Sequence, residues 1–242
     1  MSIIYYSQPN TTFSDLYINA RKKENRFYSE EEIRELPNIK KNHPHYAEWK
    51  LRKIAASRFV NYLKSKDKPL NILEIGCGNG WFSHLMSNVK KTQVTGLDVT
   101  IVELEQADKA FDKENLSFAY ADLFENTELY NENFDLIVFN SSLQYFENLK
   151  ELFKIVSNLL SENGEIHIID SPFYKNSEVE KAKERTKNYY KNLGFPEMSK
   201  NYFHHSLNNL SKHKIMYNPV SFLKYFKKDS PFYWVLITTD AQ

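Results

Sequence analysis

The chain has 242 residues, with 32 basic and 31 acidic side chains, a formal net charge of +1 and a mean hydropathy of −0.60. This length suits one large domain, and the charge gives no electrostatic reason to expect a nucleic-acid partner. The single cysteine, Cys77, excludes a disulfide framework, a structural zinc site and a CxxC redox pair. No apolar run approaches the ~18 residues of a membrane span, and the N-terminus lacks an apolar signal stretch. We therefore expect a cytoplasmic protein with no membrane partner.

The charge is distributed unevenly along the chain. Residues 71–170 carry 6 basic and 17 acidic side chains, whereas residues 1–70 carry 14 and 8, and residues 171–242 carry 12 and 6. An acidic middle between two basic flanks suggests that the flanks fold back over the middle. Charge-balanced solubility is the alternative explanation.

Helical patterns dominate the first 69 residues. Ser29-Glu30-Glu31-Glu32 has the residues of a capping box. Pro44 suits the first turn of a longer helix, whose apolar residues recur mostly at spacings of three to five between positions 46 and 63. Pro69 ends that segment. We expect residues 1–69 to form a helical N-terminal cap.

From Leu70 onward, apolar strand patterns alternate with helical ones. Thr100-Ile101-Val102-Glu103 resembles a capping box, and Gly164 is expected to end the helix before the fifth strand. Such alternation indicates βαβ units and a parallel sheet. The expected strands are Leu70–Ile75, Thr92–Val99, Leu116–Ala121, Phe134–Phe139, Glu165–Ile169, Lys214–Tyr217 and Phe232–Thr238.

Beyond Asp170 the alternation loosens. A charged helix is expected from Ser177 to about Gly194, residues 198–211 are weakly helical, and a short Pro219-led helix separates the last two strands. We expect residues 70–242 to form one domain with a helical insertion at about 171–212.

Three of the six glycines alternate in one loop, as Gly76, Gly78 and Gly80, directly after the first expected strand. The carboxyl end of such a strand is where a doubly wound sheet binds its nucleotide. A dinucleotide fingerprint needs glycine at position 81, where the chain has Trp81, and the Gly-Lys-Ser/Thr of a P-loop is absent. Glu74, two residues before the first glycine, instead favours a cationic ligand.

Carboxylates also follow the next two expected strands. Asp98 ends the second strand and can accept hydrogen bonds from both hydroxyls of an adenosine ribose. Asp122 follows the third strand and can accept a hydrogen bond from an adenine amino group. A ligand with adenosine, a positive charge and no phosphate is S-adenosylmethionine.

In this order, the motifs resemble those of class I S-adenosylmethionine-dependent methyltransferases of the small-molecule type. The shared motifs are Glu-x-Gly-x-Gly-x-Gly, the acidic residue closing strand two, Ala-Asp after strand three, and Phe-Asp-Leu-Ile-Val, over about residues 70–170. The resemblance implies an α/β fold with a doubly wound, mostly parallel seven-stranded sheet. Its last strand would be antiparallel, and a helical N-terminal cap would complete the fold.

The resemblance also implies roles for individual residues. Residues 74–80 would hold the methionine part of the cofactor, Asp98 its ribose, and Asp122 with Leu123 its adenine. Residues after strand four would line the methyl-transfer side, although simple turn capping also explains Ser141. The expected cofactor-binding residues are Glu74, Gly76, Cys77, Gly78, Gly80, Asp98, Val99, Ala121, Asp122, Leu123, Asn140, Ser141 and Tyr145.

No single residue stands out as a general base. Sulfonium methyl transfer is an in-line displacement, which needs a base only if the acceptor starts protonated. The candidates, all in the flanks, are His43, His45, Tyr46, His204 and His205.

Motifs that are absent from the sequence exclude several kinds of methyltransferase. The chain lacks the Asn-Pro-Pro-Tyr signature of DNA amino methylation, a cysteine outside the glycine loop, and the paired aspartates of a metal-dependent catechol-type enzyme. A metal-independent enzyme with a small-molecule acceptor remains. The alternatives are a polyamine-synthase-like transferase on the same fold and a non-catalytic S-adenosylmethionine-binding protein. The acceptor atom and the oligomeric state are left open.

Overall fold

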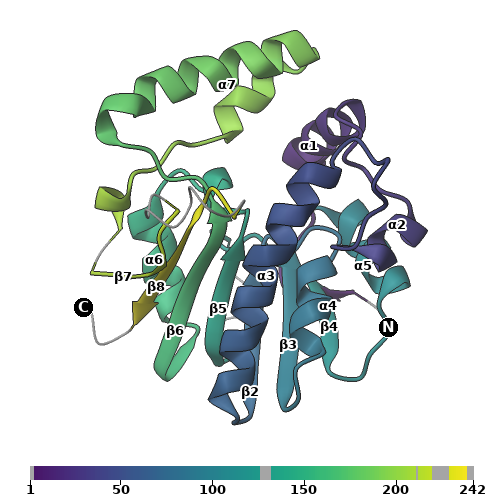
Figure 1. Ribbon diagram of the computed structural model, residues 1–242, viewed down its shortest axis with the longest axis vertical. Helices are drawn as coiled ribbons and strands as arrows, with labels where there is room; N and C mark the ends of the chain where they lie inside the picture. The colour runs from purple at the N-terminus through teal and green to yellow at the C-terminus, as the bar shows by residue number, and fades with distance from the viewer. Residues whose placement is uncertain (1–2, 126–131, 211, 220–228, 239–242) are drawn as a thin grey trace.

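A β-sheet forms the centre of the protein, with its strands in the order β1-β4-β3-β2-β5-β6-β8-β7 (Figure 1). The structure, a computed structural model, describes residues 3–125, 132–210, 212–219 and 229–238. β1 to β6 run parallel, and β8 is antiparallel to both of its neighbours. The strands are β1 (Ile4–Tyr5), β2 (Leu70–Ile75), β3 (Thr92–Asp98), β4 (Leu116–Tyr120), β5 (Phe134–Asn140), β6 (Leu160–Ser171), β7 (Lys214–Tyr217) and β8 (Tyr233–Thr238).

Among the described residues the sheet has eight strands, one more than the seven expected. All seven expected segments are strands, and the last one, β8, is antiparallel as expected. The additional strand is β1, which places Ile4 opposite Ala119 at the edge beside β4. Because β1 has two residues, it shows no alternation of apolar and polar positions that a sequence could reveal.

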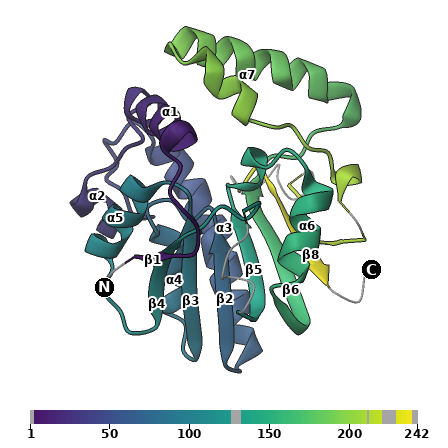
Figure 2. The same cartoon turned by 180° about the vertical axis from the view of Figure 1, so that it is seen from behind.

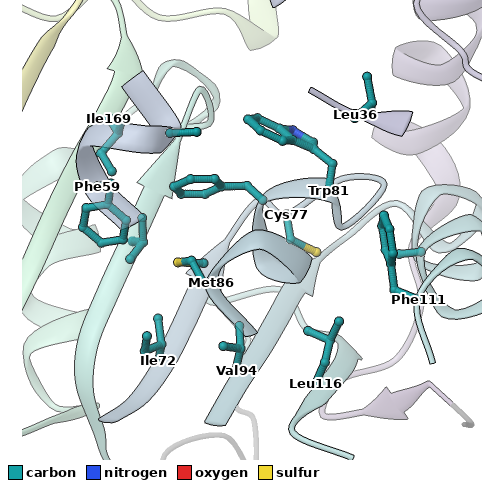
Figure 3. Close-up of a cluster of buried hydrophobic side chains, with 14 of the residues drawn as sticks. Leu36, Phe59, Ile72, Cys77, Trp81, Met86, Val94, Phe111, Leu116 and Ile169 are labelled. Atoms are coloured by element: carbon teal, nitrogen blue, oxygen red, sulfur yellow. The ribbon is translucent and has the colours of Figure 1, made fainter. Parts of the chain in front are cut away.

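Helices cover both faces of the sheet (Figures 1 and 2). α3 (Tyr46–Lys66), α4 (Trp81–Ser87) and α5 (Ile101–Ala110) lie on one face, and α6 (Leu149–Ser157) lies on the other. Figure 3 shows Phe59 of α3 and Met86 of α4 on the same side as Ile72 of β2. The next residue of β2, Leu73, packs instead with Leu152 of α6. The central strands are apolar throughout because both of their faces are buried.

α1 (Thr11–Lys23) and α7 (Val179–Leu193) form a cap at one end of the sheet (Figure 1). α1 packs against α7 through a small separate cluster that contains Ala20, Tyr190 and Met198. α2 (Glu30–Glu35) instead packs beside α5 and contributes Ile33 to the sheet core. The short 3-10 helices are η2 (Leu143–Tyr145), η3 (Asn176–Glu178), η4 (Pro196–Asn201) and η5 (Leu207–Asn209).

Of the helix-end signals expected from the sequence, some are formed in the structure and others are not. The capping box at Ser29 is formed, but the Thr100 side chain makes no cap and instead hydrogen-bonds the Asp98 carboxylate, which also accepts the Thr100 N–H at 2.8 Å. Gly164 does not end a helix: α6 ends at Ser157, and Gly164 lies inside β6. The expected Pro219-led helix lies outside the described residues.

Candidate active site

A cavity of about 630 Å³ opens at the carboxyl ends of the central strands. Its sheet side is formed by the loop after β2, by Glu103 of α5 and by the segment after β5. Its cap side is formed by α1, the start of α3, and α7. This is the edge of a doubly wound sheet at which ligands bind.

The glycine loop passes between neighbours that leave no space for larger side chains. Gly76 has φ +73°, and a Cβ there would lie 2.5 Å from the Cβ of Ser142. Gly80 has φ +74°, and a Cβ there would lie 2.6 Å from the ring of Phe118. Both positions need glycine for the positive φ and for the close packing. The loop is therefore fixed tightly to the sheet and to the segment after β5.

Glu74 is a buried carboxylate on the sheet side of the cavity, with 1% of its surface exposed. Ser83 donates a hydrogen bond to it at 2.5 Å, and Asn140 is a second partner. Burial raises the pKa of Glu74 to about 8, since these hydrogen bonds offset only part of the desolvation. Among the described residues it has no basic ion-pair partner within 4 Å, so a positively charged ligand would favour its ionised form.

Asp98 fastens the glycine loop to the start of α5. One carboxylate oxygen accepts the Gly78 N–H at 2.8 Å, and the other accepts the Thr100 N–H at 2.8 Å. Burial raises the pKa of Asp98, while the backbone hydrogen bonds act in the opposite direction. Asp98 lies next to the cavity but outside its lining.

The expected cofactor-binding residues divide into two groups. Those that line the cavity are Glu74, Gly76, Cys77, Gly78, Asn140, Ser141 and Tyr145. Those outside its lining are Gly80, Asp98, Val99, Ala121, Asp122 and Leu123. Beside this second group the N-terminal segment crosses the sheet edge, where the Asp122 N–H donates to Ser7 Oγ at 2.9 Å.

The expected general-base candidates lie outside the lining of the cavity. The ring Nε2 of His45 lies 2.9 Å from the Glu24 carbonyl oxygen, and that of His205 lies 2.9 Å from the Phe146 carbonyl oxygen. The Nε2 of His204 lies 2.9 Å from Thr186 Oγ1. The other two candidates, His43 and Tyr46, lie beside the start of α3. Within the described ranges no histidine lines the cavity.

Three arginines of the cap side were not singled out from the sequence. Arg26 donates to both Glu48 oxygens, at 2.7 and 2.5 Å, and Arg52 donates to Glu48 at 3.0 Å. Arg52 also reaches Asp170 at 3.6 Å and donates to Ser141 at 3.3 Å. Burial opposes ionisation of Glu48, but these arginines outweigh it and hold its pKa at about 2. This network ties the start of α3 to the ends of β5 and β6.

Arg21, the third of these arginines, keeps unused hydrogen-bonding capacity. Its Nη1 lies 3.2 Å from a Glu24 oxygen, whereas its buried Nε has no partner. The buried Oε1 of Gln144 is also unpartnered, while its Nε2 donates to Ser141. Tyr17 and Tyr145 also line the cavity, and their rings meet edge to face with centroids 5.6 Å apart. Arg21 and Gln144 thus each keep a buried polar atom without a partner, beside the aromatic residues of the cavity wall.

The comparisons with known proteins agree with this geometry. Residues 66–218 match the family described as "Methyltransferase domain". The chain belongs to the class I S-adenosylmethionine-dependent methyltransferase family. S-adenosylmethionine is the cofactor of that family, and the glycine loop and the cation-favouring Glu74 fit it.

The similarity to curated relatives covers only part of each relative's sequence. Malonyl-acyl-carrier-protein O-methyltransferase of Acetivibrio thermocellus is 32% identical over 125 residues, 50% of this chain and 43% of that protein. Malonyl-acyl-carrier-protein O-methyltransferase 2 of Ilyobacter polytropus is 31% identical over 132 residues, 52% of this chain and 49% of that protein. The chain therefore spans less than half the length of these two relatives.

Solved structures resemble the fold more completely. The plantazolicin methyltransferase BpumL in complex with SAH has a TM-score of 0.54 at 16% identity, over 92% of this chain and 97% of that one. The YcgJ protein of Bacillus subtilis has a TM-score of 0.53 at 16% identity, over 66% of this chain and 71% of that one. At these identities the likeness shows the shared fold.

The described residues contain neither a cluster of metal ligands nor a helix suited to a membrane. No group of three or more His, Cys, Asp or Glu residues there is placed to hold a metal ion. None of the described helices is both long enough and apolar enough to cross a bilayer.

Proposed function

We propose that the protein transfers the methyl group of S-adenosylmethionine to a carboxylate oxygen of a small or carrier-linked acceptor. The curated relatives support transfer to oxygen, since their names describe O-methyltransferases of malonyl-acyl-carrier protein. A malonyl group ends in a carboxylate. The chain itself supplies the observation that carries the proposal, on the cap side of the cavity.

That observation is the chemistry of the cavity lining. Arg21 lines the cavity and its buried Nε has no hydrogen-bond partner, while no histidine lines the cavity in the part of the chain that the structure describes. A carboxylate is already ionised at neutral pH, so its methylation needs no general base. Charge-assisted hydrogen bonds from a guanidinium suit a carboxylate better than an amine or a neutral hydroxyl. The lining therefore favours an anionic acceptor.

The geometry divides the work between the two sides of the cavity. When bound, S-adenosylmethionine supplies an electrophilic methyl group on a positively charged sulfur. Glu74 and the glycine loop would hold the cofactor, while Arg21 would orient the acceptor oxygen. Tyr17 and Tyr145 form part of the cavity wall beside Arg21. Holding two reactants in line contributes on the order of 7–11 kcal/mol to such a reaction.

The reaction can be tested with cofactor labelled in the methyl group. The acceptors would be a malonyl thioester, free dicarboxylic acids, a primary amine and a phenol. We expect label in the carboxylates only, released as volatile methanol by mild alkali because the product is an ester. Alkali-stable label on the amine or the phenol would contradict the proposal. Tight cofactor binding without turnover on any acceptor would favour the non-catalytic alternative.

Arg21→Gln tests the assigned acceptor contact. We expect kcat/KM for the carboxylate acceptor to fall at least tenfold, because a hydrogen bond to a charged group is worth about 1.5–3 kcal/mol. At pH 9, well above the pKa of about 7 of the nearby Glu103, which Arg21 helps to lower, affinity for S-adenosylhomocysteine should stay within about twofold. Lys23→Gln removes an exposed charge from the same helix and is the matched control, expected to behave as wild type. An equal loss of cofactor affinity in Arg21→Gln would assign Arg21 to the cofactor instead.

Three expectations from the sequence remain proposals. They are the division into a cap of residues 1–69 and a domain of residues 70–242, the insertion at about 171–212, and the cytoplasmic location. A polyamine-synthase-like transfer remains the second catalytic alternative, and a labelled aminopropyl group in place of a labelled methyl group distinguishes it.

A further inference from the structure

Glu103, in the first turn of α5, presents a buried carboxylate to the cavity. It is 6% exposed and belongs to the cavity lining. Among the described residues its carboxylate has no hydrogen-bond partner and no ion-pair partner. It is therefore an acceptor with its full capacity available at the cofactor side of the cavity.

Glu103 and Asp98 meet the same residue of the glycine loop. The Gly78 N–H donates to Asp98, and a Cβ at Gly78 would lie 3.2 Å from Oε2 of Glu103. Asp98 already accepts a backbone N–H on each oxygen and lies outside the cavity lining. Glu103, in the first turn of the helix that follows β3, thus lines the cavity with a carboxylate that has no hydrogen bond or ion pair among the described residues.

We propose that Glu103 binds the ribose hydroxyls of the cofactor beside Asp98, as a second ribose-binding carboxylate. The proposal rests on S-adenosylmethionine being the ligand of this cavity. The ribose is the part expected here, since nucleotide-binding sheets place it at the end of the strand that precedes α5. Hydroxyl groups donate and a carboxylate accepts, so the pairing is complementary. Glu74 and Asn140, at the ends of β2 and β5, would hold the methionine part instead.

A purely structural role would not explain this burial. An acidic residue in the first turn of a helix interacts favourably with the helix dipole, but it can do so when it is exposed to solvent. A buried charge without a partner costs stability. A ligand that donates hydrogen bonds to Glu103 would offset this cost in the bound protein.

The groups around Glu103 determine its response to pH. They are Asp98 at the end of β3, Arg21 and Tyr17 on α1, Cys77 in the glycine loop and Tyr145 in η2. Burial and the Asp98 charge raise the pKa of Glu103 to about 7, and Arg21 acts in the opposite direction. Only the ionised form accepts bonds on both oxygens, so cofactor affinity should weaken as the pH falls below about 7.

The test compares Glu103→Met and Glu103→Gln with Glu105→Gln, which removes an exposed charge from the same helix. Glu103→Met should raise the melting temperature of the cofactor-free protein, because it removes an unpaired buried carboxylate. It should also raise the dissociation constant of S-adenosylhomocysteine at least tenfold, as should Asp98→Ala. Glu103→Gln should weaken binding less and lose the part of the pH dependence between pH 6 and 8 that Glu103 causes. Glu105→Gln should match wild type in both measurements.

A second ligand distinguishes ribose recognition from recognition of the cofactor's ammonium group. Methylthioadenosine keeps the ribose and lacks the amino-acid part. We expect the Glu103→Met penalty to persist with it; a penalty confined to S-adenosylhomocysteine would overturn the ribose assignment. Unchanged affinities in both Glu103 variants would overturn the proposal entirely. If wild type binds neither ligand, the cofactor assignment of the whole cavity fails instead.

Discussion

Glu74 on the sheet side of the cavity is fully buried and Glu48 on the cap side is half-buried, and their surroundings drive their pKa values apart. Glu74 has hydroxyl and amide partners only, and its pKa rises to about 8. Glu48 is held by Arg26 and Arg52, and its pKa falls to about 2. The sheet side therefore favours a positively charged ligand, whereas the charges of the cap side are largely paired within the protein.

Under the proposed function, this contrast would let one cavity bind a positively charged cofactor and an anionic acceptor. The cofactor carries a sulfonium, which complements Glu74 on the sheet side. Arg21 is a cap-side arginine with a buried, unpartnered nitrogen, and its charge would complement an anionic acceptor. Opposite charges on the two sides would bring the acceptor oxygen and the methyl group together before any chemistry occurs.

The largest difference in unfolding free energy should come from glycine substitutions on the sheet side and on the cap side of the cavity. Gly80→Ala forces a Cβ to within 2.6 Å of the Phe118 ring at φ +74°, so we expect a loss of roughly 3 kcal/mol or more in unfolding free energy. Gly194→Ala, at the end of α7, meets nothing within 4 Å and should lose only about 1 kcal/mol from its positive φ. Urea unfolding measures both. Equal losses would show that the loop is less tightly packed than described.

Removing each carboxylate should have opposite effects on the pH dependence of stability. The raised pKa of Glu74 means that its ionisation destabilises the folded protein increasingly from about pH 4.5 to 8. Glu74→Gln should therefore exceed wild type in stability, by an amount that grows over this range. Glu48 stabilises above about pH 4.5 and loses this effect as the pH falls towards 2, so Glu48→Gln should be less stable at neutral pH.

Denaturant unfolding of the cofactor-free variants from pH 3 to 9 makes this comparison. Ser83→Ala is a useful control, because it removes a hydrogen-bond partner of Glu74 while leaving its carboxylate in place. The same sign for Glu74→Gln and Glu48→Gln at neutral pH would contradict the contrast between the two sides.

The sheet side was predictable because its signals are local in sequence. Apolar runs gave the seven longer strands, and the alternating glycines located the loop at the end of β2. The two-residue β1 gave no such signal, because its position depends on pairing with Ala119 and Tyr120, far along the chain. Asp98 was predicted at the strand end, although not as the partner of the Thr100 N–H that replaces a capping box.

The cap side was not predictable because its contacts join distant segments. Arg26 meets Glu48, and Arg52 meets Ser141 and Asp170, only once α3 has packed across the sheet. In the sequence these arginines look like charges on solvated helices. The histidines drew attention as acid–base residues, but the fold places them outside the lining of the cavity.

The most direct test of the account is the melting temperature of the wild-type protein with four ligands. S-adenosylmethionine and S-adenosylhomocysteine should each raise it, since a ligand at a hundred times its dissociation constant stabilises by about 2.7 kcal/mol. NADH and ATP should leave it unchanged, because the loop has Trp81 in place of a third fingerprint glycine and no Gly-Lys-Ser/Thr. Stabilisation by NADH or ATP, with none from the two S-adenosyl ligands, would contradict the account.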